Sequence, residues 1–315
     1  MRTKQIEMLS LEDLVEENHN YRKFKKVFNF RKIDYRLKQM ESGKGCKGYG
    51  MERLFKCLLY QFMEDLSDRQ LEEALKTNCV AKWFCEFGLS EKTPDHSLFG
   101  EVRKRIGTKK LSKLFQIMKE QLSDKGYMSE VFTFVDSAHL ISKAQLWEER
   151  DKAIKQKYDK LNNEILPKVA RDKQARIGCK GKNKYWFGYK THRSVDMQSG
   201  LINKIAVTPA NINDADALKH ICPNQGAIYG DKGYCTLPAQ KAAAKNNVHL
   251  AAIKLNNMKT KNKDLDKWYT KLRSPYERVF SKRNKRVRYL GVAKNQFAEF
   301  MNAISFNLKR LAVIA

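Results

Sequence analysis

The chain has 315 residues, of which 42% are apolar, so it is long enough for two ordinary domains and too hydrophobic to be disordered by composition. Its 62 Lys and Arg residues against 35 Asp and Glu residues leave a formal net charge of +27. Cations at this density repel one another unless a polyanion is the usual partner, so nucleic acid is the first candidate and an anionic membrane surface the second. A basic ribosome-type binding protein is the alternative without catalysis.

Membrane, secretion and zinc signals are absent from the sequence. No apolar run approaches the roughly 18 residues that a membrane span needs. The N-terminal segment, MRTKQIEMLSLEDL, lacks the apolar stretch of a signal peptide. The seven cysteines form no C-x-x-C pair, which argues against a zinc site and fits reduced thiols. We therefore expect a cytoplasmic protein with no membrane partner.

Residues 1–125 have the pattern of a helical domain. Ser67 is a good N-cap for one helix, and the turn at 94–97 precedes another. Several short helices in a basic chain fit a DNA-binding helix-turn-helix, and they fit a plain helical bundle equally well. Apolar side chains recur at helical spacing most clearly at Leu54, Leu58, Leu59 and Phe62.

Residues 126–315 have an α/β pattern. The apolar run Val131–Val135 predicts a strand buried on both faces. Two short links make the first three strands a candidate antiparallel meander, whereas helices separate the later strands and predict parallel pairing. We expect a mixed sheet with helices on both faces. The further strands are predicted at residues 185–195, 201–207, 227–229 and 249–255, and the helices at 213–218 and 238–246.

Two basic segments of this second domain carry no strand signal. Residues 141–184 contain many lysines and predict a charged helical insertion with a loose basic end. Residues 256–272 are interpreted as a basic linker. Two helices are expected to close the chain, and the last one has a continuous apolar face.

Two aspartates follow the first and fourth predicted strands. Asp136 and Asp231 are each expected at a strand's carboxyl end, where sites form in open sheets. If those strands are neighbours, the two carboxylates face one crevice. Oxygen ligands suit Mg²⁺ or Mn²⁺ better than zinc, and two such ions about 3.5–4 Å apart can serve an in-line phosphoryl displacement. Taken singly, each aspartate also fits a turn or N-cap position.

Glu277 has two interpretations. Ser274, Pro275 and Glu277 fit a capping box with Ser at N-cap, Pro at N1 and Glu at N3, and local chemistry favours this cap. However, residues 254–294 hold 14 Lys and Arg residues and only three acids. A lone glutamate amid this charge is well placed to bind a metal ion beside a phosphate backbone.

These motifs, in this order, resemble those of insertion-sequence transposases of the DDE class, in the IS-four/IS-five supergroup and closer to its IS-five-like branch. The resemblance covers most of the chain, and it is carried by the order of the motifs together with the matching strand order. The matching segments are Leu66–Glu72, Pro94–Ser97, Val135–Ser137, Gly188–Asp196, Thr208–Asn211, Gly230–Tyr234, Glu277–Phe280, Arg288–Gly291 and Asn307–Arg310.

The resemblance implies a ribonuclease-H-like fold for the α/β domain. It also implies that Asp136, Asp231 and Glu277 are the catalytic residues and bind two Mg²⁺ (or Mn²⁺) ions, which favours the metal-ligand interpretation of Glu277 over the cap. Within this resemblance, DNA contacts are expected from Arg273, Lys282, Lys285, Lys232 and His192.

One part of the family pattern is only partly matched. The wider supergroup often shows Tyr-x2-Arg-x3-Glu-x6-Lys, and Arg273 fits it relative to Glu277. Its Tyr and Lys positions are occupied here by Thr270 and Asn284. The nearest candidates for those two roles are Tyr269, Lys282 and Lys285.

Three other side chains have a functional and a structural interpretation. His139 fits a residue that orients a ligand or a DNA end, and it fits an ordinary polar neighbour. Trp268 and Tyr269 fit a stacking platform for an unpaired base, and they fit packing equally well.

The expected function is that of an insertion-sequence transposase. It would bind inverted-repeat DNA ends through the N-terminal helices and the basic insertion, cut a phosphodiester and join the 3′ end to target DNA. The family implies a homodimer on DNA in the bacterial cytoplasm, associated with the nucleoid. The alternatives are a transposase-derived nuclease, a non-catalytic DNA-binding protein of transposase origin and a basic RNA-binding protein.

Overall fold

The computed structural model describes residues 8–39, 48–142, 163, 170–180, 184–277 and 286–314. The chain divides into two compact units. The helical unit comprises Met1–Gln121 and Ile304–Ala315, and the sheet unit comprises Leu122–Ala303. Most of the predicted insertion at 141–184 lies outside the described residues. In the part of the chain that the structure describes, no helix is both long and apolar enough to cross a membrane.

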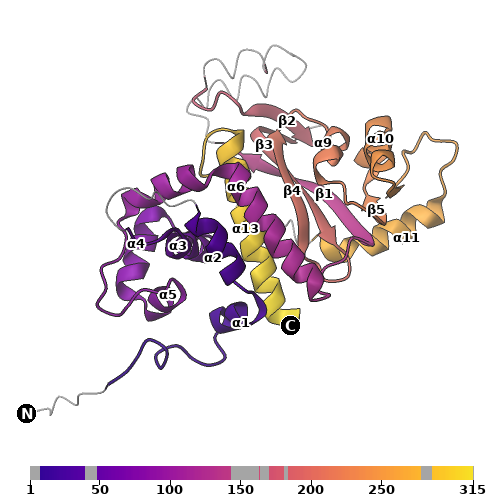
Figure 1. Ribbon diagram of the computed structural model, residues 1–315. Coiled ribbons are helices and arrows are strands. Elements are labelled where there is room, and N and C mark those ends of the chain that lie inside the picture. Colours follow the sequence, from indigo (N-terminus) through magenta and orange to yellow (C-terminus); the bar gives the residue numbers. More distant parts are fainter. Residues whose placement is uncertain are drawn as a thin grey trace, which may run out of the picture. The chain divides into compact units, whose positions relative to one another are not determined.

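The helical unit contains no strand in its described residues, as the sequence predicts (Figure 1). Ser67 caps α4 in a capping box with Gln70: the Ser67 hydroxyl accepts from the Gln70 N–H at 3.3 Å, and the Gln70 side chain accepts from the Ser67 N–H at 2.8 Å. Its helices are α1 (Asn20–Val27), α2 (Arg31–Lys38), α3 (Met51–Met63), α4 (Asp68–Thr77), α5 (Cys79–Phe84) and most of α6 (His96–Asp124).

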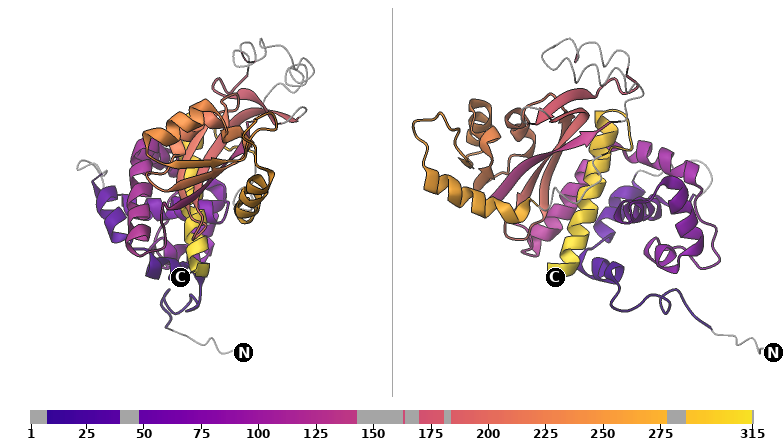
Figure 2. Two further views of the ribbon diagram at one scale, coloured as in Figure 1. Left: turned by 90° about the vertical axis from the view of Figure 1, so that its right-hand side faces the viewer. Right: turned by 180° about the vertical axis from the view of Figure 1, so that it is seen from behind.

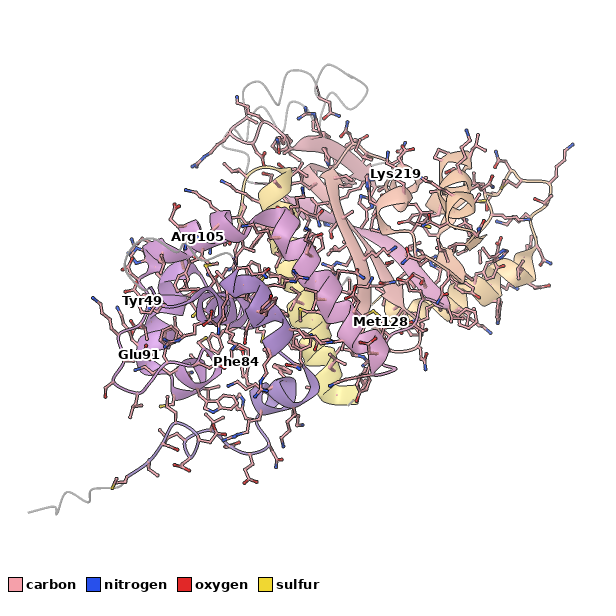
Figure 3. The ribbon with its side chains drawn as sticks, in the orientation of Figure 1. Tyr49, Phe84, Glu91, Arg105, Met128 and Lys219 are labelled. Carbon is pink, nitrogen blue, oxygen red and sulfur yellow. The ribbon has the colours of Figure 1, made fainter. Side chains whose placement is uncertain are left out.

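Buried aromatic rings hold the first helices of this unit together. Phe84, labelled in Figure 3, has its ring centroid 4.6 Å from that of Tyr21 and 6.2 Å from that of Phe30. Gly107 interrupts α6 with φ +61°, a backbone conformation that glycine adopts at little cost. The long helix is therefore two segments joined at a kink, and the second segment starts after Gly107.

The described residues of the sheet unit form a sheet of six strands. The antiparallel meander β1–β3–β4 and the parallel pairing of β5 with both β1 and β6 confirm the predicted topology. An additional strand, β2, pairs antiparallel with β3. The strands are β1 (Phe132–Ile141), β2 (Arg176–Lys180), β3 (Lys184–Asp196), β4 (Ile202–Pro209), β5 (Ala227–Gly230) and β6 (His249–Ala252).

Helices cover both faces of the sheet, and side-chain alternation along β1 and β5 shows how. Val135 and Ile228 pack in one hydrophobic cluster with α9 (Asp214–Ile221) and α10 (Leu237–Lys245). The adjacent residues Phe134 and Tyr229 point to the opposite face. There Phe134 contacts Arg273 and Tyr229 contacts Trp268, and both contacted residues belong to α11 (Lys263–Arg273). In the left view of Figure 2, α9 and α10 lie on one side of the strands and α11 on the other.

Two predictions for the second domain are wrong. Residues 176–180 form β2 inside the expected insertion; a side chain added at Gly178 would lie 2.7 Å from the Ala210 carbonyl oxygen, so this strand depends on close tertiary packing that a local pattern does not show. Most of the expected linker is α11. Asn262 caps this helix by accepting from the N–H groups of Asp264 and Leu265.

The sheet unit also contains the start of α13 (Val292–Ile314), which lies on the α11 face. Thr191 and Arg193 of β3 both donate to the Glu299 carboxylate of this helix, at 2.8 and 2.9 Å. Because residues 191 and 193 share a face, their neighbour His192 points to the opposite, α9 face.

Candidate active site

The sequence analysis expected Asp136 at the carboxyl end of its strand, but it lies in the middle of β1. The strand continues to Ile141 along its antiparallel partner β3. The parallel pairing with β5 ends at Phe134 opposite Tyr229. Two residues further along each strand lie Asp136 and Asp231, and adjacent strands are about 4.8 Å apart. The structure therefore brings these two aspartates together from neighbouring strands.

The electrostatics of Asp136 reflect this arrangement. Burial raises the pKa of its carboxyl group to about 6, and the negative charge of Asp231 acts in the same direction. The backbone N–H of Ser137, which donates to the Asp136 carboxylate at 2.8 Å, and the charge of Arg273 partly oppose the rise in pKa. The ionised pair is thus unfavourable without a compensating cation.

Asp231 is held by its own turn. It ends β5 and caps the short 3₁₀ helix Lys232–Tyr234, where its Oδ1 accepts from the Gly233 N–H at 2.8 Å. This contact uses one oxygen of the carboxylate and fixes the side chain beside the strand end. Lys232, the next residue, is exposed and donates to Asn256 Oδ1 at 3.3 Å.

Arg273 is buried on the same face. Its guanidinium carbon lies 5.3 Å from the centroid of the Phe134 ring, and its charge lowers the pKa of Asp136. Its buried Nε has no hydrogen-bond partner among the described residues. Arg273, which the sequence analysis expected to contact DNA, is therefore a buried cation near Asp136.

Glu277 ends the segment that carries Arg273, and its side chain is exposed. Ser274 has helical dihedral angles and makes no cap to the 3₁₀ turn Ser274–Tyr276, so the capping-box interpretation is wrong. Tyr276 packs near Phe134 with 6.0 Å between ring centroids, which keeps this segment on the Asp136 face. Among the described residues, Glu277 does not join Asp136 and Asp231 in a group of ligand atoms within 4.8 Å.

The likeness of the chain to known families lies in its sequence, and it covers residues of both units. The sequence model of the transposase DDE domain family matches residues 124–308, more than half of the chain. The chain belongs to this family. A second model, described as a transposase domain (DUF772), matches residues 9–105.

As a DDE transposase, the protein is a metal-dependent enzyme of DNA cleavage and transposition. The residues present fit a divalent cation: Asp136 and Asp231 offer oxygen ligands side by side, and the cost of their mutual repulsion is the kind that a bound cation removes. The donors that the structure brings together are therefore suitable for hard divalent metals.

Two histidines singled out in the sequence lie away from this face of the transposase. His192 is fully buried, bonds Thr208 Oγ1 through Nε2 at 2.8 Å and has a pKa lowered to about 4 by burial, so it is not a surface DNA contact. His139 is an odd number of residues from Asp136 and therefore points to the opposite face, where its ring lies 5.4 Å from that of Trp186. Lys282 and Lys285 lie outside the described residues.

Two residues of the transposase were missed by the sequence analysis. Asp214, in the first turn of α9, accepts from the Ser137 hydroxyl at 2.8 Å and from Lys190 Nζ at 3.1 Å, so it holds the residue that follows Asp136. Tyr234 is fully buried among the charges of Asp214, Asp136 and Asp231, and its hydroxyl has no partner among the described residues. Tyr234 belongs to the segment Gly230–Tyr234 that carries the resemblance, whereas Asp214 had no signal beyond its place at the start of a predicted helix.

The helical unit contains a separate acidic group, Glu72, Asp95 and His96, whose ligand atoms lie within 4.8 Å of one another. Its contacts explain it without a metal. Glu72 accepts from the His96 backbone at 3.0 Å, from the His96 ring at 2.6 Å and from Lys76 at 2.6 Å. This group of residues fixes the start of α6 against α4.

Proposed function

We propose that this transposase belongs to an insertion sequence of the IS-four/IS-five supergroup and that it cuts and joins DNA at Asp136, Asp231 and Glu277. It binds the terminal inverted repeats of its element, hydrolyses a phosphodiester to free a 3′-hydroxyl and directs that hydroxyl at target DNA. The observation that carries the proposal is the adjacent pair Asp136 and Asp231 on neighbouring strands of a mixed sheet.

Two Mg²⁺ (or Mn²⁺) ions bound by these carboxylates would activate the attacking oxygen and stabilise the leaving oxygen. Asp136 supplies a buried oxygen ligand whose position is fixed by the strand and by the Ser137 N–H. Asp231 supplies a second one and is oriented by Gly233. Arg273 balances the negative charge at this site from the α11 side.

Glu277 completes the set in this proposal by turning inward when DNA and metal bind. Three observations support it: the segment lies on the Asp136 face, Tyr276 anchors it beside Phe134, and the exposed Glu277 carboxylate forms no hydrogen bond or ion pair with a described residue that would have to break. Lys232 is exposed beside Asp231 and is a DNA contact in this proposal, together with Arg273, Lys282 and Lys285.

The finer architectural assignments belong to the same proposal. The strand order β4-β3-β1-β5-β6, with antiparallel pairing on one side of β1 and parallel pairing on the other, supports a ribonuclease-H-like fold for residues 126–315. The helical domain, residues 1–125, binds DNA. Two DNA ends must be held for joining, so the acting form is a homodimer on double-stranded DNA at the bacterial nucleoid in the cytoplasm.

Asp136→Asn tests the proposal directly. It should abolish Mg²⁺-dependent nicking of supercoiled plasmid and leave DNA affinity near that of the unaltered protein. Asp264→Asn is the matched control, because the Asp264 side chain is 94% exposed and its ion pair is with Lys267. An Asp136→Asn variant that still cuts in Mg²⁺ contradicts the assignment. A strand-transfer assay with precut ends then separates a transposase from a nuclease that cuts without joining.

A further inference from the structure

A groove in the helical unit has chemistry that the catalytic site does not use. It lies between α2 and the second segment of α6 and encloses about 530 Å³. Leu114 and Ile117 of α6 form its apolar lining. Three exposed cations, Arg36, Lys110 and Lys113, line it from the two helices, with Gln39 and Gln116 beside them.

The α2 side of the groove is strongly basic. Four of the eight residues of α2 are Lys or Arg, and all four are exposed. The single acid of this helix, Asp34, is turned to Lys56 at 3.5 Å and does not neutralise them. Tyr35, also on α2, is 64% exposed, an aromatic ring set among cations. The four cations are Arg31, Lys32, Arg36 and Lys38.

The α6 side has the same character. Lys109, Lys110 and Lys113 are exposed on consecutive turns after the Gly107 kink. Lys110 donates only to a backbone carbonyl, that of Arg105, at 3.3 Å. Glu120 is the one acid in the lining, and its carboxylate accepts from Gln116 at 3.2 Å.

Several cations elsewhere in the helical unit have acidic partners. Arg53 bonds Glu91, labelled in Figure 3, at 2.7 Å. Arg103 bonds Asp68 at 2.5 Å, and Lys104 bonds Glu101 at 2.7 Å. By contrast, Arg36, Lys110 and Lys113 form no ion pair with any residue that the structure describes. Because no described acid pairs with these three cations, an anionic partner at the groove would gain from all of them.

We propose that this groove binds the sugar–phosphate backbone of duplex DNA through Arg36, Lys110 and Lys113. Three cations on two facing helices match a run of phosphates, and the amides of Gln39 and Gln116 add neutral donors of the kind that contact phosphate and sugar. Ile117, which is half-buried, suits the apolar face of a sugar, whereas Leu114 is buried beneath it. A hollow of this size admits one strand's backbone and not a base-paired helix, so the contact positions DNA without reading its sequence. The inference rests on the proposed function, in which this enzyme binds duplex DNA outside its catalytic carboxylates.

The test is a triple variant, Arg36→Gln with Lys110→Gln and Lys113→Gln, in EDTA to prevent cleavage. The probe is a fluorescent mixed-sequence DNA duplex, and affinity is measured over a range of salt concentrations. Loss of three phosphate contacts should reduce the slope of log K against log salt by about 2.7 and weaken binding on the order of 100-fold at 0.15 M salt. Each single variant should reduce the slope by about 1.

A control triple removes the same charge elsewhere: Lys76→Gln with Lys92→Gln and Lys104→Gln, all exposed in the helical unit. Its slope should change by less than about 1. Equal losses in both triples would show that only net charge matters and would overturn the groove. Unchanged affinity in the groove triple would overturn it as well. Affinity for duplex RNA is measured in the same way. A groove triple that binds duplex RNA more weakly but keeps its affinity for duplex DNA would also overturn the proposal.

The outcome is separable from that of the catalytic proposal. At low salt and saturating protein, the groove triple should still nick plasmid in Mg²⁺, because Asp136 and Asp231 are untouched. If nicking depends on Asp136 while the groove triple binds normally, the catalytic proposal stands and the groove fails. If the unaltered protein binds no DNA duplex, both fail. Thermal unfolding of each variant shows that the exposed substitutions leave the fold intact.

Discussion

Asp136 of β1 lies close to Asp231, which directly follows the parallel neighbouring strand β5, and the charge of Asp231 raises the pKa of Asp136. The ionised pair is therefore an energetic cost in the metal-free fold, since burial disfavours the charge of Asp136 and the charge of Asp231 adds to this effect. Residues that are kept at a cost to stability are expected where a cation binds. This cost makes the pair testable by stability measurements as well as by activity.

Asp231→Asn should stabilise the metal-free transposase at pH 7, by about 1 kcal/mol, because it removes the like charge beside Asp136. The amide oxygen can still accept from Gly233, so the turn is preserved. The same change should remove the rise in Tm that Mg²⁺ produces in the unaltered protein. Thermal unfolding with and without Mg²⁺ measures both effects. A variant that is less stable without metal and still responds to Mg²⁺ would contradict the pairing.

Acid should destabilise the protein through His192. Burial lowers the pKa of His192 to about 4 in the fold, below its ordinary value of 6.5. Between these values the unfolded chain binds the extra proton, so stability is complete above pH 6.5 and is lost as the pH falls toward 4, by up to about 3 kcal/mol. Urea unfolding at a series of pH values measures the slope.

His192→Asn should flatten that part of the pH profile, whatever it does to stability at pH 7. The control is His249→Gln, since His249 is exposed. A profile that is equally steep in the His192 variant would assign the acid sensitivity to other groups.

The buried pair Arg193–Glu299 should contribute to stability only while both partners are present. Glu299→Gln removes the carboxylate charge 2.9 Å from the Arg193 guanidinium, which is 2% exposed, and should cost about 3–5 kcal/mol in urea unfolding. Replacing both, with Arg193→Met and Glu299→Leu, should recover much of that loss because neither charge is then buried. A double variant that is as unstable as Glu299→Gln would contradict this prediction, because it would show that the loss does not come from an uncompensated buried charge.

Apolar sequence patterns predicted those strands of the sheet whose side chains are buried. The apolar runs found β1, β3, β4, β5 and β6, and the short links found the meander. They failed for β2, which has few apolar residues and is held by pairing with β3 and by the close approach of Gly178 to Ala210. They also failed for α11, where basic composition suggested a linker and the Asn262 cap was overlooked.

The candidate site was also predicted only in part. The sequence analysis put Asp136 and Asp231 in one crevice on the condition that their strands are neighbours, and β1 and β5 meet this condition, although the length of β1 was underestimated. Asp214 could not be found this way, since its bond to Ser137 depends on how α9 docks on the sheet. His192 was misjudged because this part of β3 is buried on both faces, so the polar residues Thr191, His192 and Arg193 all lie inside.

Removing the hydroxyl of Tyr234 and removing that of Tyr189 should change the free energy of unfolding in opposite directions. Its hydroxyl is fully buried without a hydrogen-bond partner among the described residues, and such burial costs about 1–3 kcal/mol. Tyr234→Phe should therefore raise the free energy of unfolding. Tyr189 is equally buried, but its hydroxyl donates to Asp172 at 2.6 Å, so Tyr189→Phe should lower the free energy of unfolding by about 1–3 kcal/mol. Urea unfolding in EDTA compares the two, and a destabilised Tyr234→Phe would reveal a partner for that hydroxyl.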